Sequence, residues 1–299
     1  MSSKRRLALS FGVVAVIVAA FAVAVYLMGE SKSSALFSEK IGVVEVRGVI
    51  ADPAPTLQAL HKFRKDKNIR AILLRVDSPG GGVGASQEIF REIQRVKRVK
   101  PVVCSMGGVA ASGGLYISLP CSKVVANPGT ITGSIGVILT IPELKQLFEK
   151  IGIRMQVVKS GDLKATGQID RPLSEAERAM LQTLSSDIFE QFIKHVSSSR
   201  NIPVDKVRTF ANGGVFSGEK AKELGLVDKL GNFMDAVQLA AKLAGIKGEP
   251  QLVSPQEDIP SLLERMLREE GRALVQGLLD GLQSAESMQY LYRPSYPVN

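Results

Sequence analysis

The residue whose type and setting best suit it to chemistry is Ser112, within the small-residue run GGVAASGG (107–114). Apolar segments lie on both sides of the run, so a strand-to-helix turn at the serine would expose its hydroxyl. The first turn of a helix also offers free N–H groups and a partial positive charge. An exposed hydroxyl beside such donors is what the nucleophile of an acyl-transfer reaction needs. The alternative is a serine that only caps a helix in a tightly packed turn.

A serine nucleophile needs a base, and the chain holds two histidines, His61 and His195. Both fall in helix-like stretches, away from strand ends and glycine-rich turns, so we expect them on helix surfaces. A Ser-His-Asp triad is therefore poorly supported. Histidine, cysteine and carboxylate residues nowhere cluster with the spacing of a metal site, so we predict no metal and no cofactor.

The remaining type of base is a lysine with a neutral amine. The ordinary pKa of lysine is about 10.4, and removal of the amine from water lowers it. The candidate is Lys164, because it belongs to the small-residue loop SGDLKATG (160–167) and not to a charged helix. An exposed loop lysine is the alternative. Asp162 weakens the case slightly, because a close anion favours the charged amine.

Two further glycine-rich turns are candidates for the same site. The segment PGGG (79–82) lets a ligand approach the backbone and leaves N–H groups free, and it does not have the pattern of a phosphate-binding loop. The segment NPGTITGSIGV (127–137) puts Ser134 at a turn, where its hydroxyl could orient a neutral lysine. A structural turn serine is the alternative. We expect the pocket lining to come from Val83–Gln87 and from the turn after Thr130.

The elements that must position these residues alternate between apolar runs and amphipathic stretches. This alternation predicts βαβ units and an α/β fold with a mostly parallel sheet covered on both faces. A capping box, SEAE (174–177), opens a long helix whose inward residues we expect to be Leu181, Leu184, Ile188, Phe192 and Val196. The predicted strands are 41–46, 71–76, 102–104, 123–126 and 154–158, with a turn at 77–82. The other predicted helices are 55–64, one ending near 99, a short one after the Ser112 turn, 142–151, 218–224 and 233–244.

The N-terminal segment Leu7–Met28 has 22 residues without a charge, which is long enough to span a bilayer as a helix. Positive charges at 4–6 put the N-terminus in the cytoplasm and the rest of the chain outside it. A cleaved signal peptide, with an apolar core of about 7–15 residues, is the alternative. We predict a cytoplasmic N-terminus and anchor (1–29), a linker (30–40), a catalytic domain (41–250), and a C-terminal helix with a flexible tail (251–299). This corresponds to a single-pass protein of the cell (inner) membrane with an extracytoplasmic, periplasmic domain.

The net charge of +9 does not indicate nucleic-acid binding. Three of the positive charges belong to the orientation signal, and others lie on the helix-like stretch 91–100 without interleaved aromatic residues. A solvated helix face explains this stretch, with attraction to anionic lipid as the second interpretation. The two cysteines, Cys104 and Cys121, lie in or beside apolar runs, so we expect buried free thiols, with a bridge between them as the alternative.

Taken together, these segments resemble the signal peptide peptidase A (SppA) family of membrane-anchored serine proteases. The resemblance covers about residues 41–245, and its pieces occur in the order of the family. It implies a fold similar to the Clp protease and crotonase superfamily, built of repeated ββα units. The matching pieces are DSPGGG (77–82), AASGGLYI (110–117), ANPGTITGSIGV (126–137), SGDLK (160–164) and GLVDKLG (225–231).

The resemblance also implies roles for individual residues. The chain departs from the family at Leu115, where an aromatic residue is common, and after the candidate lysine, where the usual acidic neighbour is missing; both departures concern fine specificity more than catalysis. The implied site residues are the nucleophile Ser112, the general base Lys164, the lysine-positioning Ser134, and the oxyanion donors Gly113 and Gly81, with Gly80 as the other possibility for the second donor.

The chain matches the short, single-repeat members of that family. This implies a homo-oligomeric ring, an octamer, in which neighbouring subunits could complete each site. The implied substrates are signal peptides left in the membrane after secretion and other short peptides, and the implied partner surface is the lipid bilayer. Two alternatives remain: an NfeD-type membrane protease acting on a stomatin-like partner, and a non-catalytic scaffold with a crotonase-like fold.

Overall fold

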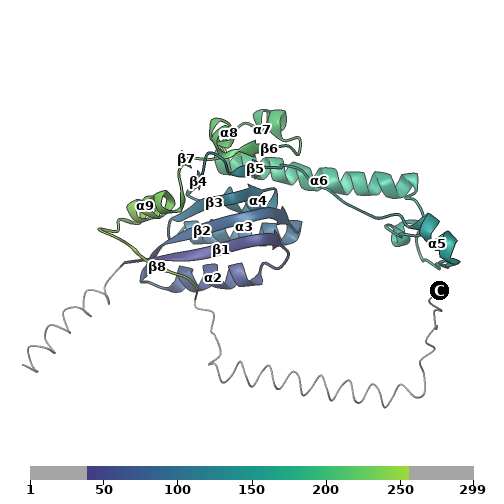
Figure 1. Cartoon of the computed structure of the whole chain (residues 1–299), viewed down its shortest axis with the longest axis horizontal. Coiled ribbons are helices and arrows are strands. Elements are labelled where there is room, and N and C mark those ends of the chain that lie inside the picture. Colours follow the sequence, from purple (N-terminus) through teal and green to yellow (C-terminus); the bar gives the residue numbers. More distant parts are fainter. Residues whose placement is uncertain (1–38, 256–299) are drawn as a thin grey trace, which may run out of the picture. The chain divides into compact units, whose positions relative to one another are not determined.

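The structure, a computed structural model, describes residues 39–255. The predicted anchor, nearly all of the predicted linker, and the predicted C-terminal helix and tail after residue 255 lie outside the described residues. Within 39–255, eight strands form one sheet in the order β6-β5-β3-β2-β1-β8, with β4 paired to β3 and β7 (Figure 1). The strands are β1 Lys40–Ile50, β2 Ile69–Gly81, β3 Val102–Ala111, β4 Lys123–Ala126, β5 Ile131–Gly133, β6 Val215–Ser217, β7 Lys229–Leu230 and β8 Gln251–Val253.

Every strand pair except β5 with β6 is parallel, so the predicted α/β class and mostly parallel sheet are confirmed. None of the helices between residues 39 and 255 is both long and apolar enough to cross a bilayer. The helices are α2 Ala54–Lys65, α3 Val83–Lys97, α4 Gly113–Ser118, α5 Lys145–Ile151, the 3-10 helix η1 Asp162–Ala165, α6 Glu175–Arg200, α7 Val204–Phe210, α8 Gly218–Glu223 and α9 Phe233–Ala244.

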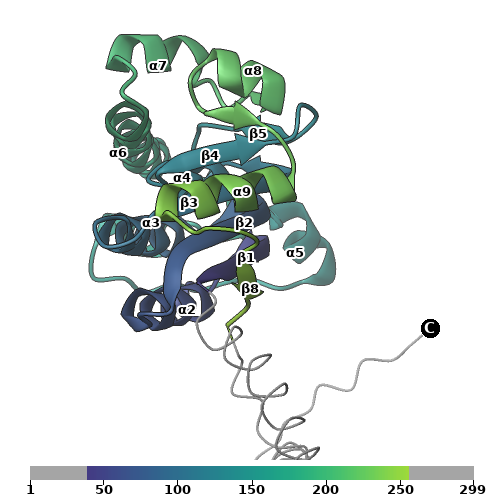
Figure 2. The same cartoon turned by 90° about the vertical axis from the view of Figure 1, so that its left-hand side faces the viewer.

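Helices cover both faces of the sheet, which explains why its central strands are continuous apolar runs. Successive side chains of a strand point to opposite faces. On β1, Ile41 and Val43 pack with α9, whereas Val44 and Val46 pack in the larger core under α2, α3 and α4 (Figure 2). Both cysteines are buried free thiols, as predicted; the Cys104 thiol donates a hydrogen bond to Ser118 Oγ at 3.1 Å.

Strands β2 and β3 are longer than predicted, and the excess lies next to the candidate site. The prediction that residues 77–82 form a turn is wrong, because β2 continues to Gly81 and pairs there with Ile50 of β1. The prediction that the third strand ends at residue 104 is also wrong, since β3 continues to Ala111. Backbone pairing to neighbours distant in sequence keeps these glycine-rich segments extended, which a local turn signal cannot anticipate.

Strand β3 changes its neighbour along its length. Its first half pairs with β4 over Val103–Ser105, and its second half pairs with β5 over Val109–Ala111. The carboxyl ends of β3 and β5 therefore lie side by side. In a parallel sheet, ligands bind beyond the carboxyl ends of the strands, where the strand order changes.

We call residues 138–184 the arm; it contains α5, η1 and the first half of α6, and Figure 1 shows α6 running from the sheet out to α5. The predicted strand 154–158 is wrong: these residues are exposed and pair with no described strand. The predicted helix 142–151 begins only at Lys145. The capping box that opens α6 is confirmed, but Leu184 is exposed and not inward, because the first half of α6 does not pack on the core.

Candidate active site

The backbone of Ser112 is strained at the junction of β3 and α4. Its φ of 52° and ψ of −116° lie in a region that residues other than glycine seldom adopt. Its N–H donates to Gly133 O at 2.8 Å, and its carbonyl accepts from the Tyr116 N–H at 2.9 Å, which holds the residue in this conformation. The serine is partly exposed. Strain at a partly exposed serine between a strand and a helix is typical of a functional residue.

Ser134, at the end of the neighbouring strand, also has a positive φ. Its φ is 51°, and its N–H donates to Gly214 O at 2.7 Å. Because Ala111 pairs with Gly133, the register of β3 and β5 puts Ser112 and Ser134 on adjacent strand ends, which are about 4.8 Å apart in a sheet. Both serines line the same cleft, whose volume is about 720 Å³.

Glycines at the end of β2 and the start of α4 bring two backbone segments together beside Ser112. A methyl group placed on Gly80, whose φ is +107°, would lie 2.7 Å from Gly113 N and 2.9 Å from Ser112 Cβ. A methyl group placed on Gly113 would lie 3.2 Å from Gly81 N. Only glycine therefore permits this approach, which sets the N–H groups of both segments next to the serine.

The two possible second donors of an oxyanion hole differ in availability. The Gly80 N–H already donates to Ser78 Oγ at 3.1 Å, and Gly80 is buried. Gly81 is exposed and lines the cleft with Ser112. The geometry therefore favours Gly113 with Gly81 over Gly113 with Gly80 as a pair of donors toward a developing oxyanion.

Besides Ser112, the cleft is lined by the end of β2, the start of α3, the segment that follows β5, the middle of α6 and the segment Ala211–Gly213. A second, smaller cavity of about 40 Å³ opens beside Ser112 between α3, α4 and α6. The expectation that Val83–Gln87 and the turn after Thr130 line the pocket is confirmed. Sequence reasoning missed the contribution of Tyr116 and α6, because it depends on how helices pack and not on a local motif.

Lys164 lies apart from this cleft within the chain. It is exposed on η1, and η1 is bound to the start of α6 through Arg171, which donates to Ala165 O at 3.1 Å and pairs with Glu177 at 2.7 Å. The small cavity beside Ser112 instead meets α6 at Ile188 and Phe192. Between Glu177 and Ile188, α6 rises about 16 Å at about 1.5 Å per residue. One chain alone therefore does not bring the lysine to the serine.

The histidines do not supply a base in its place. His61 is exposed on α2, as predicted. The prediction of a surface position is wrong for His195, which is half-buried, stacks on Phe90 with ring centroids 4.7 Å apart, and hydrogen-bonds the Tyr116 hydroxyl through Nδ1. Burial lowers the pKa of His195. Between residues 39 and 255, no group of histidines, cysteines and carboxylates is arranged to hold a metal ion.

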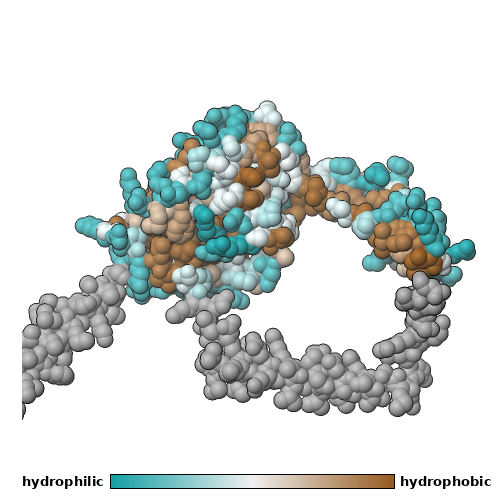
Figure 3. Space-filling model, viewed as in Figure 1, coloured by the Kyte–Doolittle hydropathy of each residue, from teal (hydrophilic) through white to brown (hydrophobic). Residues whose placement is uncertain are grey.

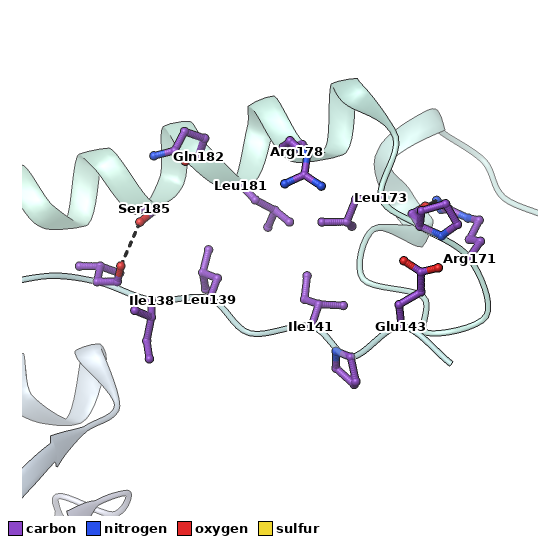
Figure 4. A pocket seen from close by; sticks show the side chains of 13 residues that line it. Ile138, Leu139, Ile141, Glu143, Arg171, Leu173, Arg178, Leu181, Gln182 and Ser185 are labelled. Atoms are coloured by element: carbon purple, nitrogen blue, oxygen red, sulfur yellow. Dashed lines mark hydrogen bonds between the residues drawn. The ribbon is translucent and has the colours of Figure 1, made fainter. Parts of the chain in front are cut away.

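The cleft continues along the arm as a groove of about 530 Å³ that is lined by both apolar and polar side chains. Figure 4 shows Leu139 and Ile141 pointing toward Leu181 of α6, and Ile138 pointing away. Ser185 Oγ donates to Val137 O at 3.5 Å across the groove. Figure 3 shows apolar surface along the arm and at its end. In proteins generally, large exposed apolar patches occur at protein–protein, membrane or ligand-binding sites.

Comparison with known proteins assigns the chain to a family. Residues 94–247 match the model of peptidase family S49, and residues 34–129 match the Clp protease model. The protease slr0021 of Synechocystis sp., so named provisionally, is 42% identical to this chain. The match covers 84% of this chain and 91% of that protein. The chloroplastic serine protease SPPA of Arabidopsis thaliana is 31% identical over 83% of this chain. Protease 4 of Salmonella typhi is 40% identical over 64% of it.

The relatives differ in how much of them this chain covers. It spans 39% of the Arabidopsis protein and 31% of the Salmonella protein, so both contain long regions without a counterpart in the match. The matched family model covers the turn with Ser112, the second strained serine and the loop with Lys164. The chain thus belongs to peptidase family S49 and is a serine protease of the SppA type.

Proposed function

We propose that this protein is a membrane-anchored endopeptidase that degrades residual signal peptides, with Ser112 as nucleophile and Lys164 of a neighbouring subunit as general base. The observation that carries the proposal is the strained, partly exposed serine beside two converging glycine N–H groups, in a chain whose candidate base lies elsewhere. The ring of subunits, an octamer by the family resemblance, supplies the missing base.

The proposed reaction is acyl transfer. Ser112 Oγ attacks the scissile carbonyl carbon while the lysine Nζ accepts the hydroxyl proton. The N–H groups of Gly113 and Gly81 donate to the oxygen that becomes negative. The lysine then returns the proton to the leaving amine, and the acyl-enzyme is hydrolysed by water activated through the same amine. Ser134, beside Ser112 on the adjacent strand end, is the hydroxyl that positions the amine.

The surface of the arm supports a neighbouring subunit as the source of the lysine. Lys164 is exposed at the end of the arm, and several large apolar residues around it are exposed as well. Leu163, next to it in the chain, is 41% exposed, and Val158 is fully exposed. Burying this surface against a second copy is favourable by about 25 cal/mol per Å² of apolar area. The same contact would remove water from the amine, which favours its neutral, basic form.

The membrane and substrate parts of the proposal rest on the uncharged segment 7–28 and on the SppA resemblance. An anchor there confines the catalytic domain near the bilayer, where residual signal peptides are released. The linker of 11 residues reaches at most about 35–40 Å when extended.

The decisive experiment is subunit complementation with peptide hydrolysis as the readout. Ser112→Ala and Lys164→Ala should each abolish hydrolysis and leave thermal unfolding nearly unchanged, because one change is small and the other lies on the surface. Co-expressed in equal amounts with separate affinity tags, the two inactive variants should recover about one quarter of wild-type activity, since each site needs an intact serine from one subunit and an intact lysine from its neighbour.

Lys159→Ala is the matched control, since Lys159 is exposed in the same loop, and it should retain full activity. Inactive single variants without any recovery in the mixed assembly would assign the lysine to the same subunit as the serine. Full activity of either single variant would remove the Ser-Lys mechanism.

A further inference from the structure

Ser86 is a buried hydroxyl without a hydrogen-bond partner. It lies in the first turns of α3, directly after the glycines that end β2, and it is only 3% exposed. Its Oγ hydrogen-bonds no atom of residues 39–255. An unpaired buried hydroxyl destabilises a fold, and most buried polar atoms in proteins are paired. Such a group is therefore a candidate for a contact that forms only when a ligand is bound.

The hydroxyl lines the small cavity beside the nucleophile. A methyl group placed on Gly113 would lie 2.6 Å from Ser86 Oγ, so the oxygen stands next to the backbone that follows Ser112. The cavity of about 40 Å³ also contains Ser112 itself. On this measure a single water needs about 10–15 Å³, so the cavity accommodates about two or three non-hydrogen atoms.

The other polar side chains of the cavity already have partners. The Tyr116 hydroxyl is bound to His195, and the Gln87 amide donates to Gln191 Oε1 at 3.0 Å. The rest of the lining is mostly apolar, with side chains such as Ile188 and Phe192. Of the buried polar side chains that the described chain places here, Ser86 alone has its hydrogen-bonding capacity unused.

We propose that Ser86 selects the substrate side chain that precedes the scissile bond, and that its hydroxyl hydrogen-bonds a small hydroxyl-bearing side chain, serine, in preference to alanine. The inference rests on the proposed function in one respect, the role of Ser112 as nucleophile. The size of the cavity excludes long and aromatic side chains. A serine side chain pairs the Ser86 hydroxyl, whereas an alanine side chain fills the space and leaves it unpaired, which disfavours alanine.

The test compares two peptides that differ only in serine or alanine before the cleaved bond, with the cleavage site checked by mass spectrometry. Wild-type kcat/KM should be about tenfold higher for the serine peptide, the discrimination expected of one buried hydrogen bond. Ser86→Ala should reduce this ratio to about one or below. The control Ser254→Ala, an exposed serine just after β8, should keep the wild-type ratio. A Ser86→Ala variant that loses activity toward both peptides equally, with the ratio unchanged, overturns the proposal.

Peptide binding separates this inference from the proposed function. In the Ser112→Ala background, calorimetry should give about tenfold tighter binding of the serine peptide, and adding Ser86→Ala should abolish the difference. If wild-type protein hydrolyses neither peptide, the proposed function fails, and this binding comparison still decides the role of Ser86. Equal binding of the two peptides, or binding of neither, overturns the inference.

Unfolding measurements distinguish a binding role from a structural one. Because the Ser86 hydroxyl has no partner in the described chain, Ser86→Ala should not lower the thermal midpoint. A hydroxyl that served the fold would lower the midpoint when removed, and that result contradicts the proposal.

Discussion

Two serines at adjacent strand ends, Ser112 and Ser134, have a left-handed backbone that costs about 1–3 kcal/mol per residue. Each is held there by a backbone hydrogen bond from its N–H to a carbonyl of another segment. The ladder between β3 and β5 fixes both residues at once, so the strain persists in the folded state. Both strained residues line the same cleft.

This strain predicts the sign of a stability change. Ser112→Gly should abolish hydrolysis and raise the free energy of unfolding by about 1 kcal/mol relative to Ser112→Ala, since glycine adopts a positive φ without a Cβ clash. Urea denaturation of the two variants measures the difference. At Ser198, inside α6, the same pair of substitutions should differ by about 1 kcal/mol in the opposite direction. Equal stability of the two Ser112 variants would mean that its backbone is not strained.

The sequence predicts those site residues that belong to a short, recognisable motif. Ser112, Ser134 and Gly81 stand in short glycine-rich segments, and all three line the cleft. Ser86 was not predicted, because its position depends on the packing of α3. A signal was present, however: Ser86 shares the buried stripe of its helix with Ile89 and Ile93, where an apolar residue is expected.

At the scale of elements, the junction of η1 with α6 depends on one carboxylate. Glu177 accepts two hydrogen bonds from the Arg171 guanidinium, at 2.7 and 2.8 Å, and one from the Ser174 N–H at 2.8 Å. The hydrogen bonds from Arg171, followed by that from Ser174, lower the pKa of Glu177 to about 2. Arg171 in turn donates to Ala165 O, so the same carboxylate ties the loop with Lys164 to the helix.

The lowered pKa predicts an acid-sensitive junction. The ionised Glu177 stabilises the fold fully above its ordinary pKa of about 4.3, and this contribution is lost as the pH falls toward about 2. Glu177→Gln should reduce the fall of the thermal midpoint between these pH values. Glu175→Gln, an exposed neighbour on the same turn, is the control and should keep the wild-type dependence. Identical pH profiles for wild type and Glu177→Gln contradict the assignment.

The bounds of a helix could be predicted from the sequence where its capping residues and its apolar periodicity lie within the helix itself or next to it. The bounds of α9 match the prediction from Phe233 to Ala244, because Asn232 caps its start and Gly245 ends it. The segment 154–158 has the composition of a strand, but no described strand lies beside it to pair with. Strand β8, just past the predicted end of the domain at residue 250, pairs with β1. Whether each of these two segments forms a strand depends on pairing with a segment distant in the sequence, and the local residue pattern does not reveal that pairing.

At the scale of the whole molecule, several apolar residues of the arm remain exposed to solvent in a single copy of the chain. Val158→Asp puts a charge where the side chain is fully exposed, so it should leave the fold of one chain intact. On the proposed ring it should dissociate the assembly and abolish hydrolysis, because a buried, unpaired charge is costly. Light scattering coupled to gel filtration measures the mass.

The matched control is Val99→Asp, which changes a side chain that is 66% exposed after α3, outside the arm. It should leave both mass and activity unchanged. A Val158→Asp protein with the mass of wild type would show that the tip of the arm is not a subunit contact.

Helix α6 separates the loop with Lys164 from Ser112 within one chain, and on the proposed pairing of subunits this separation controls when the enzyme is active. A newly made chain carries one half of each of two catalytic centres and no complete one. On this pairing, a single chain is inactive until it assembles with other copies. On the proposed pairing, proteolysis begins only where enough copies assemble, so the onset of activity depends on the local concentration of the protein.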